Sequence, residues 1–268
     1  MVNVMIKNFN FKENYNVYDL VEIIKILRGE GGCPWDMVQT HESIRKDFIE
    51  ETYEVIEAIN KQNTDMLREE LGDVLMQVVF HAQIETEKGV FDIDDVADEI
   101  CKKMIIRHPH VFGDVNAETV DDVLTNWDAI KRKTKGQKST SEAIDSIPRE
   151  LPALMRAAKV QHKASKAGFD WKEVSGALDR LSDEVEELKQ AVKGGVQSEI
   201  SDELGDVLFS AVNVSRFVNA EAEEALTGST DKFVSRFKKV EKMAEERGIN
   251  MQETELDILD ELWDEAKK

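Results

Sequence analysis

An internal duplication constrains the fold of this chain more than any other feature of its sequence. Four acidic residues recur with the same identity 133 residues later: Glu51, Glu54, Glu70 and Asp73 return as Glu184, Glu187, Glu203 and Asp206. The four tryptophans also form two pairs, each 136 residues apart: Trp35 with Trp171, and Trp127 with Trp263. This period is far longer than that of a solenoid repeat, so it indicates two copies of one domain.

A polar segment separates the two copies. Residues 134–141 contain glycine, lysine, serine and threonine and offer no apolar side chain as an anchor, which is typical of a linker. We therefore predict an N-terminal domain over residues 1–133, a linker over residues 134–150 and a C-terminal domain over residues 151–268.

The hydrophobic pattern is helical throughout. Only four prolines occur, and apolar residues recur at spacings of three and four, as in residues 18–27 and 71–79. No stretch alternates with a period of two. We predict an all-α protein whose helices are interrupted at residues 29–34, 108–116 and 134–141.

Composition excludes several classes of protein. With 41% hydrophobic residues the chain can bury a core, and a net charge of −20 disfavours a nucleic-acid partner because phosphates would be repelled. Two cysteines do not make a disulfide framework or a zinc cluster, so we expect a reducing, cytoplasmic location. Residues 1–12 lack the apolar stretch of a signal peptide, and no segment is as apolar as a membrane span, so we expect no membrane association.

The duplicated acids form the candidate site. Residues three apart share a helix face, so Glu51 lies with Glu54, and Glu70 lies with Asp73. The polar residues 60–64 predict a short turn between antiparallel helices, which would place the two pairs opposite each other. Carboxylates gathered in this way need a compensating charge, and oxygen ligands without cysteine or histidine suit Mg²⁺ or Mn²⁺.

A solvated acidic face is the alternative interpretation, because a single E-x-x-E pattern is common on exposed helices. Duplication at fixed spacing favours the metal site instead. The apolar neighbours of the acids favour it too, since Leu71 and Leu75, like Leu204 and Leu208, predict a stripe that faces a core.

Other chemistries lack their motifs. A di-iron bundle needs Glu-x-x-His on two helices, and none of the five histidines has a glutamate three residues before it. The G-x-S-x-G, Walker A and G-x-G-x-x-G patterns are also absent from the sequence. The histidines are therefore interpreted as capping or surface residues.

Basic and aromatic residues recur after the acids in both copies. A Lys-x-x-x-Arg pair could bind phosphate oxygens, and a Trp-x-x-x-Lys pair could stack on a base. Each pattern is weak alone, but their recurrence favours a phosphate-rich nucleotide as the ligand. The candidate substrate-binding residues are Lys103, Arg107, Trp127 and Lys131 in the first copy and Lys232, Arg236, Trp263 and Lys267 in the second.

Together these motifs resemble the MazG family of nucleoside triphosphate pyrophosphohydrolases. The matching segments run along nearly the whole chain: Gly32–Asp36 (GCPWD), Glu50–Glu54 (EETYE), Glu70–Asp73 (ELGD), His108–Gly113 (HPHVFG), Leu151–Leu154 (LPAL), Gly168–Trp171 (GFDW), Glu203–Asp206 (ELGD), Lys232–Phe237 (KFVSRF) and Trp263–Lys267 (WDEAK). The resemblance implies an all-α fold of tandem, four-helix-bundle-like domains that are completed in a homodimer. It also implies Mg²⁺-dependent cleavage of NTPs or dNTPs to NMP and pyrophosphate, with broad base tolerance and a role in cleaning nucleotide pools.

The resemblance also assigns residues to roles. It places Mg²⁺ on Glu184, Glu187, Glu203 and Asp206 in the second half, which carries the principal site, and on the four matching acids in the first. Lys232 and Arg236 would bind phosphates, with Trp263 and Lys267 beside the nucleotide. Asp183 stands where the first half has Glu50, and its shorter side chain departs from the pattern at a position that could orient or deprotonate the attacking water. Candidate catalytic residues are therefore Asp183, Glu184 and Glu50.

Two other functions remain open on the sequence. A nucleotide-binding sensor would bind Mg²⁺ and nucleotide but turn over little, and an acidic helical scaffold would gain no stability from either ligand.

Overall fold

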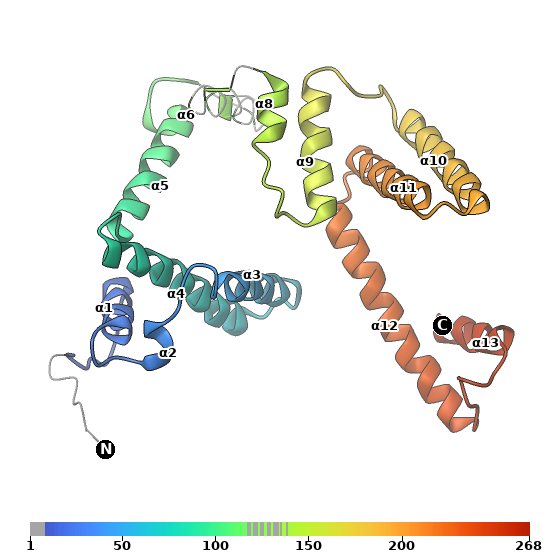
Figure 1. Ribbon diagram of the computed structural model, residues 1–268, viewed down its shortest axis with the longest axis horizontal. Helices are drawn as coiled ribbons and strands as arrows, with labels where there is room; N and C mark the ends of the chain where they lie inside the picture. The colour runs from blue at the N-terminus through green and yellow to red at the C-terminus, as the bar shows by residue number, and fades with distance from the viewer. Residues whose placement is uncertain are drawn as a thin grey trace. The chain divides into compact units, whose positions relative to one another are not determined.

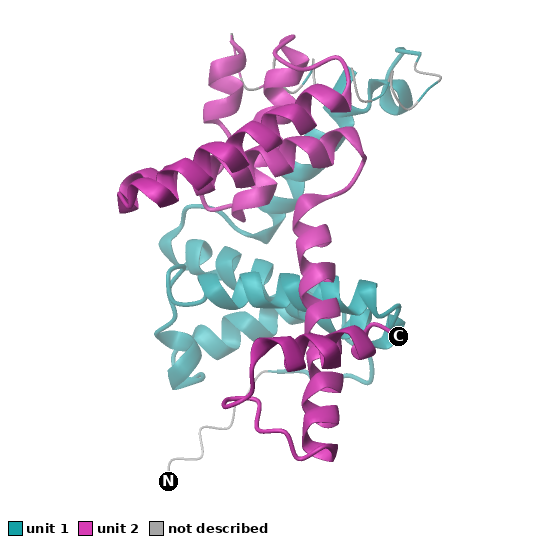
Figure 2. Ribbon diagram, turned by 90° about the vertical axis from the view of Figure 1, so that its right-hand side faces the viewer, with its two compact units in different colours: residues 1–130 teal, residues 131–268 magenta. Residues whose placement is uncertain are grey.

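The structure, a computed structural model, describes residues 9–116, 119, 123, 126–127, 130, 134, 136–137 and 139–268. The chain divides into two compact units, residues 1–130 and 131–268 (Figure 2). The described residues form helices and no strand, which confirms the all-α prediction (Figure 1). None of the helices in these ranges is both long and apolar enough to cross a membrane.

The first unit contains six described helices. They are α1 (Val17–Arg28), α2 (Pro34–Met37), α3 (Arg45–Asn60), α4 (Thr64–Lys88), α5 (Ile93–Arg107) and α6 (Pro109–Phe112). Helix α1 begins at a capping box, in which Asn16 and Asp19 satisfy each other's backbone N–H groups. Its apolar face packs on α4, where Ile24, Val79, Phe80 and Ile84 form a core together with Ile44.

Helices α3 and α4 form the predicted hairpin. They lie side by side (Figure 1) and are joined by the short turn at residues 61–63. Gln62 takes a positive φ of 52° in this turn, and the Asn63 side chain then caps α4 by accepting from the N–H groups of Asp65 and Met66. The acids of α3 and α4 therefore lie on two adjacent antiparallel helices.

The second unit repeats this hairpin. Its described helices are α8 (Thr140–Asp145), α9 (Ala153–Lys166), α10 (Val174–Gly194), α11 (Gln197–Phe217), α12 (Ala222–Glu246) and α13 (Leu256–Ala266). Helices α10 and α11 pair as α3 and α4 do, and Gly195 ends α10 in the left-handed conformation with φ 74°. Helix α12 packs against α9 and α13, and a small core of Val240, Ala244, Leu262 and Ala266 joins α12 to α13.

Of the first two predicted helix interruptions, one agrees with the structure and the other agrees only in part. Helix α1 ends at Arg28 and α2 begins at Pro34, as expected. The break at residues 108–116 is only partly correct, because Pro109–Phe112 forms the short helix α6, whose first residue is a proline with the φ that a helix needs.

Residues 134–150, the predicted linker, also contain a helix. Ser139 caps α8, which packs against α9 and buries Ala143 completely. This segment is thus attached to the second unit. The domain limits themselves stay a prediction.

The apolar stripe beside the acids is exposed to solvent in the single chain. Leu71, Leu75, Leu204 and Leu208 were predicted to face a core, but they are 51%, 37%, 47% and 49% exposed. A two-helix hairpin buries only the surface between its helices, so its outer apolar face stays exposed in the absence of further helices.

Candidate functional site

The first acidic cluster joins α3 to α4. Carboxylate oxygens of Glu51, Glu70 and Asp73 lie within 4.8 Å of one another, and all three side chains are half-buried. Glu54 is close enough for its charge to act on both Glu51 and Glu70. The structure thus brings together the acids that the sequence selected in the first copy.

Burial and mutual repulsion make the ionised form of these acids unfavourable in the absence of a cation. Burial raises the pKa of Glu51, and the negative charge of Asp73 raises it further. Burial likewise raises the pKa of Glu70, followed by the charge of Glu54. Among the described residues, no lysine or arginine forms an ion pair with any of these acids; the basic residues of α3 and α4 that form ion pairs bond other acids, Lys61 with Glu57 and Arg68 with Asp65.

The second acidic cluster joins α10 to α11. Carboxylate oxygens of Glu184, Glu187 and Glu203 lie within 4.8 Å of one another, and Glu184 is only 4% exposed. Burial raises the pKa of Glu203, and the charges of Glu187 and Asp206 raise it further. Asp206 itself is exposed and lies outside the group within 4.8 Å, although its counterpart Asp73 belongs to the first cluster.

An arginine distinguishes the second cluster from the first. Arg180 donates to Glu184 across 2.7 Å and reaches Glu187 at 3.5 Å. The residue 133 positions earlier is Asp47, which cannot supply this charge. Reasoning from the sequence missed Arg180, and comparison of positions 47 and 180 between the two copies is the signal that could have found it.

Both clusters have the donor chemistry of a hard divalent cation. Their ligand atoms are all carboxylate oxygens, which Mg²⁺ and Mn²⁺ prefer. One oxygen of Glu184 and one of Glu203 are buried without a hydrogen-bond partner among the described residues. A buried carboxylate oxygen without a partner is unfavourable, so a bound cation would satisfy both atoms. The residues present therefore fit a metal.

The candidate catalytic residues Asp183 and Glu50 lie at the edges of the clusters. Both side chains are exposed, and each directly precedes a cluster acid, Glu184 or Glu51. Neither belongs to the groups of oxygens that lie within 4.8 Å.

Two of the candidate substrate-binding residues meet in the first unit. The Arg107 guanidinium lies over the Trp127 ring, 5.1 Å from its centroid. Lys103 is exposed on α5, one turn before Arg107. Lys131 lies outside the described residues.

In the second unit the corresponding residues lie on a different helix pair from the acids. Lys232 and Arg236 are on α12, and Trp263 and Lys267 are on or next to α13. Trp263 packs on Phe233 with ring centroids 4.9 Å apart, and Lys267 pairs with Asp264 at 2.6 Å. Among the described residues, no hydrogen bond or ion pair joins these four to the acids of α10 and α11.

A histidine pair also escaped the sequence reasoning. His41 and His81 lie 2.7 Å apart between their Nδ1 atoms, and Nε2 of His41 is 2.6 Å from a carboxylate oxygen of Glu85. Burial lowers the pKa of His81, followed by the charge of His41. The interpretation of the histidines as surface or capping residues is wrong for these two, which tie the segment before α3 to α4.

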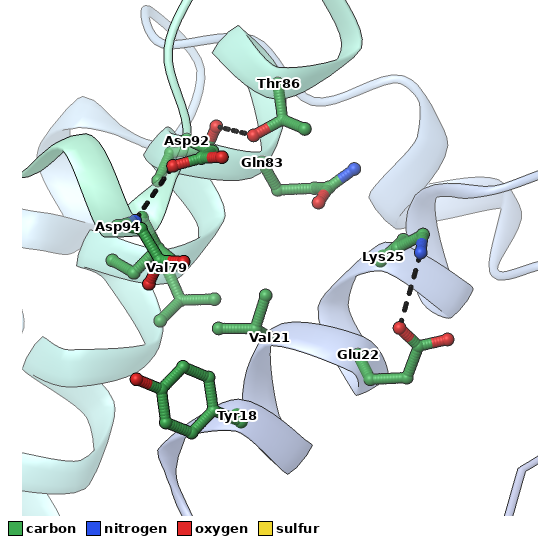
Figure 3. A pocket seen from close by; sticks show the side chains of 11 residues that line it. Tyr18, Val21, Glu22, Lys25, Val79, Gln83, Thr86, Asp92 and Asp94 are labelled. Carbon is green, nitrogen blue, oxygen red and sulfur yellow. Dashed lines mark hydrogen bonds and ion pairs between the residues drawn. The ribbon is translucent and has the colours of Figure 1, made fainter.

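One pocket lies away from the acids. It has a volume of about 250 Å³ and lies between α1, α4 and the start of α5, where Tyr18, Val21 and Val79 face one another (Figure 3). None of the residues predicted for the site lines it.

Comparisons with known proteins agree with the duplicated geometry. The model of the MazG nucleotide pyrophosphohydrolase domain matches residues 39–112 and 164–241, one match for each acidic hairpin. The nucleoside triphosphate pyrophosphohydrolase/pyrophosphatase MazG of Thermotoga maritima is 47% identical over 93% of this chain and 94% of its own length. The nucleoside triphosphate pyrophosphohydrolase of Escherichia coli K12 is 42% identical over 93% of this chain and 96% of its own length. The uncharacterized protein YabN of Bacillus subtilis is 49% identical over 92% of this chain, which covers 50% of that relative. The chain therefore belongs to the MazG nucleotide pyrophosphohydrolase family.

Proposed function

We propose that this protein is a nucleoside triphosphate pyrophosphohydrolase that converts NTPs or dNTPs and water to NMPs or dNMPs and pyrophosphate. The observation that carries the proposal is the acidic hairpin, which occurs in both halves and coincides with both matches to the family domain. Relatives that align over nearly their whole length carry the name of this activity. Broad base tolerance, a role in cleaning nucleotide pools and a cytoplasmic location belong to the same proposal.

The acids would hold Mg²⁺, with Mn²⁺ as a substitute. Bound Mg²⁺ would neutralise charge on the phosphate oxygens and make a bound water more acidic. Glu184, Glu187 and Glu203 would hold it in the second half, with Asp206 turning in from the edge. Glu51, Glu70 and Asp73 would do so in the first, together with Glu54.

The chain's other residues would position water and substrate. Asp183 and Glu50, each of which precedes a cluster acid in the sequence, would accept a proton from water that attacks the α-phosphorus. The bond from that phosphorus to the bridging oxygen would break, and pyrophosphate would leave. Lysine and arginine side chains would then stabilise the charge on the leaving group, and this role falls to Lys232 and Arg236 in the second half and to Lys103 and Arg107 in the first.

A homodimer would complete the site. In one chain, α12 and α13 pack apart from the α10–α11 hairpin, and the apolar stripe of that hairpin is exposed. A second copy would cover the stripe and form a four-helix bundle. It would also offer its own α12 and α13, with Trp263 and Lys267, to the acids.

Pyrophosphate release in the presence of Mg²⁺ tests the proposal and assigns the active half. Glu203→Gln disables the second cluster and Glu70→Gln disables the first, while each keeps the size of the side chain. We expect release to fall at least tenfold in one single variant or in both, and to be abolished when both clusters are disabled, because removal of a metal-binding charge removes the stabilisation of phosphate charge. Full turnover by the double variant, or saturable nucleotide binding by the unaltered protein without turnover, would contradict the proposal, and the second result would favour the sensor.

A further inference from the structure

The two acidic clusters differ in one positively charged side chain. In the second half, Arg180 pairs with two of the acids proposed to bind metal, at 2.7 Å from Glu184 and 3.5 Å from Glu187. In the first half the matching residue is Asp47, and no lysine or arginine of the described chain pairs with Glu51, Glu70 or Asp73. The duplication therefore supplies an internal comparison between a cluster with a resident positive charge and one without.

The geometry places the guanidinium where it competes for metal ligands. Glu184 is almost fully buried and uses one carboxylate oxygen for Arg180, while its other oxygen has no partner among the described residues. Arg180 itself is 44% exposed, so it can move into solvent without unfolding its helix. One side of Glu184 is thus held by the arginine, and the other side remains open to a cation.

We propose that Arg180 is a positioning residue that acts as the resident counter-ion of the second cluster and competes with the divalent cation for Glu184 and Glu187. This inference rests on the proposed metal site. If Arg180 competes in this way, binding of a divalent cation by the second half is an exchange. The carboxylates of Glu184 and Glu187 would lose their bonds to the guanidinium as they bind the cation. In the first half no such exchange is expected, because no arginine or lysine among the described residues pairs with its acids.

A rival explanation is that Arg180 forms an ordinary stabilising pair at spacing i, i+4 on a helix surface. Helix-surface pairs at i, i+3 and i, i+4 are common, and the same helix carries an exposed one at i, i+3 between Lys189 and Glu186, at 2.7 Å. A surface pair would leave the affinity for a cation unchanged when it is removed. Lys189→Gln is therefore the matched control, since it removes one positive charge from the same helix.

Binding of Mn²⁺ without nucleotide tests the proposal. In full-length protein with the first cluster disabled by Glu70→Gln and Asp73→Asn, free Mn²⁺ is measured by electron paramagnetic resonance at pH 8, a pH that disfavours protonation of carboxylates. We expect Arg180→Gln to tighten Mn²⁺ binding about two- to fivefold, the upper part of the range for loss of one partly exposed ion pair. Arg180→Met, a second uncharged variant, should do the same, whereas Lys189→Gln and the charge-retaining Arg180→Lys should change the dissociation constant by less than about twofold.

The possible outcomes separate this inference from the proposed function. An unchanged or weakened affinity in both uncharged variants would overturn the role of Arg180 and leave the metal site standing. Failure of every variant, and of the background protein, to bind Mn²⁺ would overturn both. Binding that appears only after Arg180 is replaced would support the competition directly. Circular dichroism of each variant checks that helix content is unchanged.

Discussion

In the metal-free protein, ionisation of the Glu70 carboxylate makes the free energy of unfolding depend on pH. Burial, followed by the charge of Glu54, raises the pKa of Glu70, so the folded protein binds a proton more readily there than the unfolded chain does. Between the ordinary value of 4.5 and the raised pKa, the free energy of unfolding therefore decreases as the pH rises. Above this window the ionised Glu70 destabilises the fold by a constant amount.

Glu70→Gln should remove this effect. Without metal, we expect the variant to have a higher melting temperature than the unaltered protein at pH 7.5, and the difference should vanish below about pH 4.5, where the carboxyl is protonated in both states. Differential scanning calorimetry across this pH range measures it. Glu13→Gln, at an exposed site in the same unit, is the control and should show no such trend. A variant less stable than the unaltered protein at pH 7.5 would contradict the account.

Magnesium should stabilise the folded protein through the carboxylates of the second cluster. We expect saturating Mg²⁺ to raise the melting temperature of the unaltered protein by on the order of a few °C, because it binds the folded state alone. With the first cluster disabled, Glu203→Gln should abolish the shift, since it removes a charge whose carboxylate has a buried oxygen without a described partner. Glu199→Gln, exposed on the same helix, should keep the shift. An equal shift in both variants would remove Glu203 from the metal site.

At the scale of elements, the turn of each hairpin fixes how its acids face each other. Gly195 ends α10 with φ 74°, a conformation that costs a residue with a side chain about 1–2 kcal/mol. Gly194 lies in the helix, and a methyl group there would meet no atom within 4 Å.

The two neighbouring glycines therefore predict opposite results. We expect Gly195→Ala to lower the free energy of unfolding by about 1 kcal/mol and Gly194→Ala to raise it by about 0.5 kcal/mol, because alanine is the better helix former. Urea denaturation followed by circular dichroism compares them. Equal effects of the two substitutions would show that the left-handed turn does not control the hairpin.

Much of the fold follows from local sequence, and some of the site does not. Periodicity predicts α1 and α4, and polar residues 60–64 predict the turn between α3 and α4, because helices and turns depend on near neighbours. The duplicated spacing also identifies the acids of both clusters. Arg180 was missed because a pair at i, i+4 is usual on any charged helix, and His41 and His81 were missed because their contact joins residues far apart in the chain. The exposed Leu71 and Leu204 were misjudged because a pattern reports an apolar face but not which chain covers it.

At the scale of the whole molecule, these apolar faces predict a homodimer. We expect sedimentation to give twice the chain mass of 30.5 kDa. Leu208→Glu, on the exposed stripe of α11, should shift the protein toward monomer, because a charge would be buried in the interface without a partner. Gln252→Glu adds the same charge in an exposed loop and should leave the dimer intact. A monomeric unaltered protein with full turnover would contradict a site completed by a second copy.

The central claim concerns which phosphate bond this protein breaks, and one measurement tests it directly. The protein is incubated with Mg²⁺ and a nucleoside triphosphate in water enriched in ¹⁸O, and the products are observed by ³¹P NMR. The account predicts pyrophosphate and nucleoside monophosphate, with the ¹⁸O label on the monophosphate because water attacks the α-phosphorus. Orthophosphate with nucleoside diphosphate, or a label found on pyrophosphate, would contradict it.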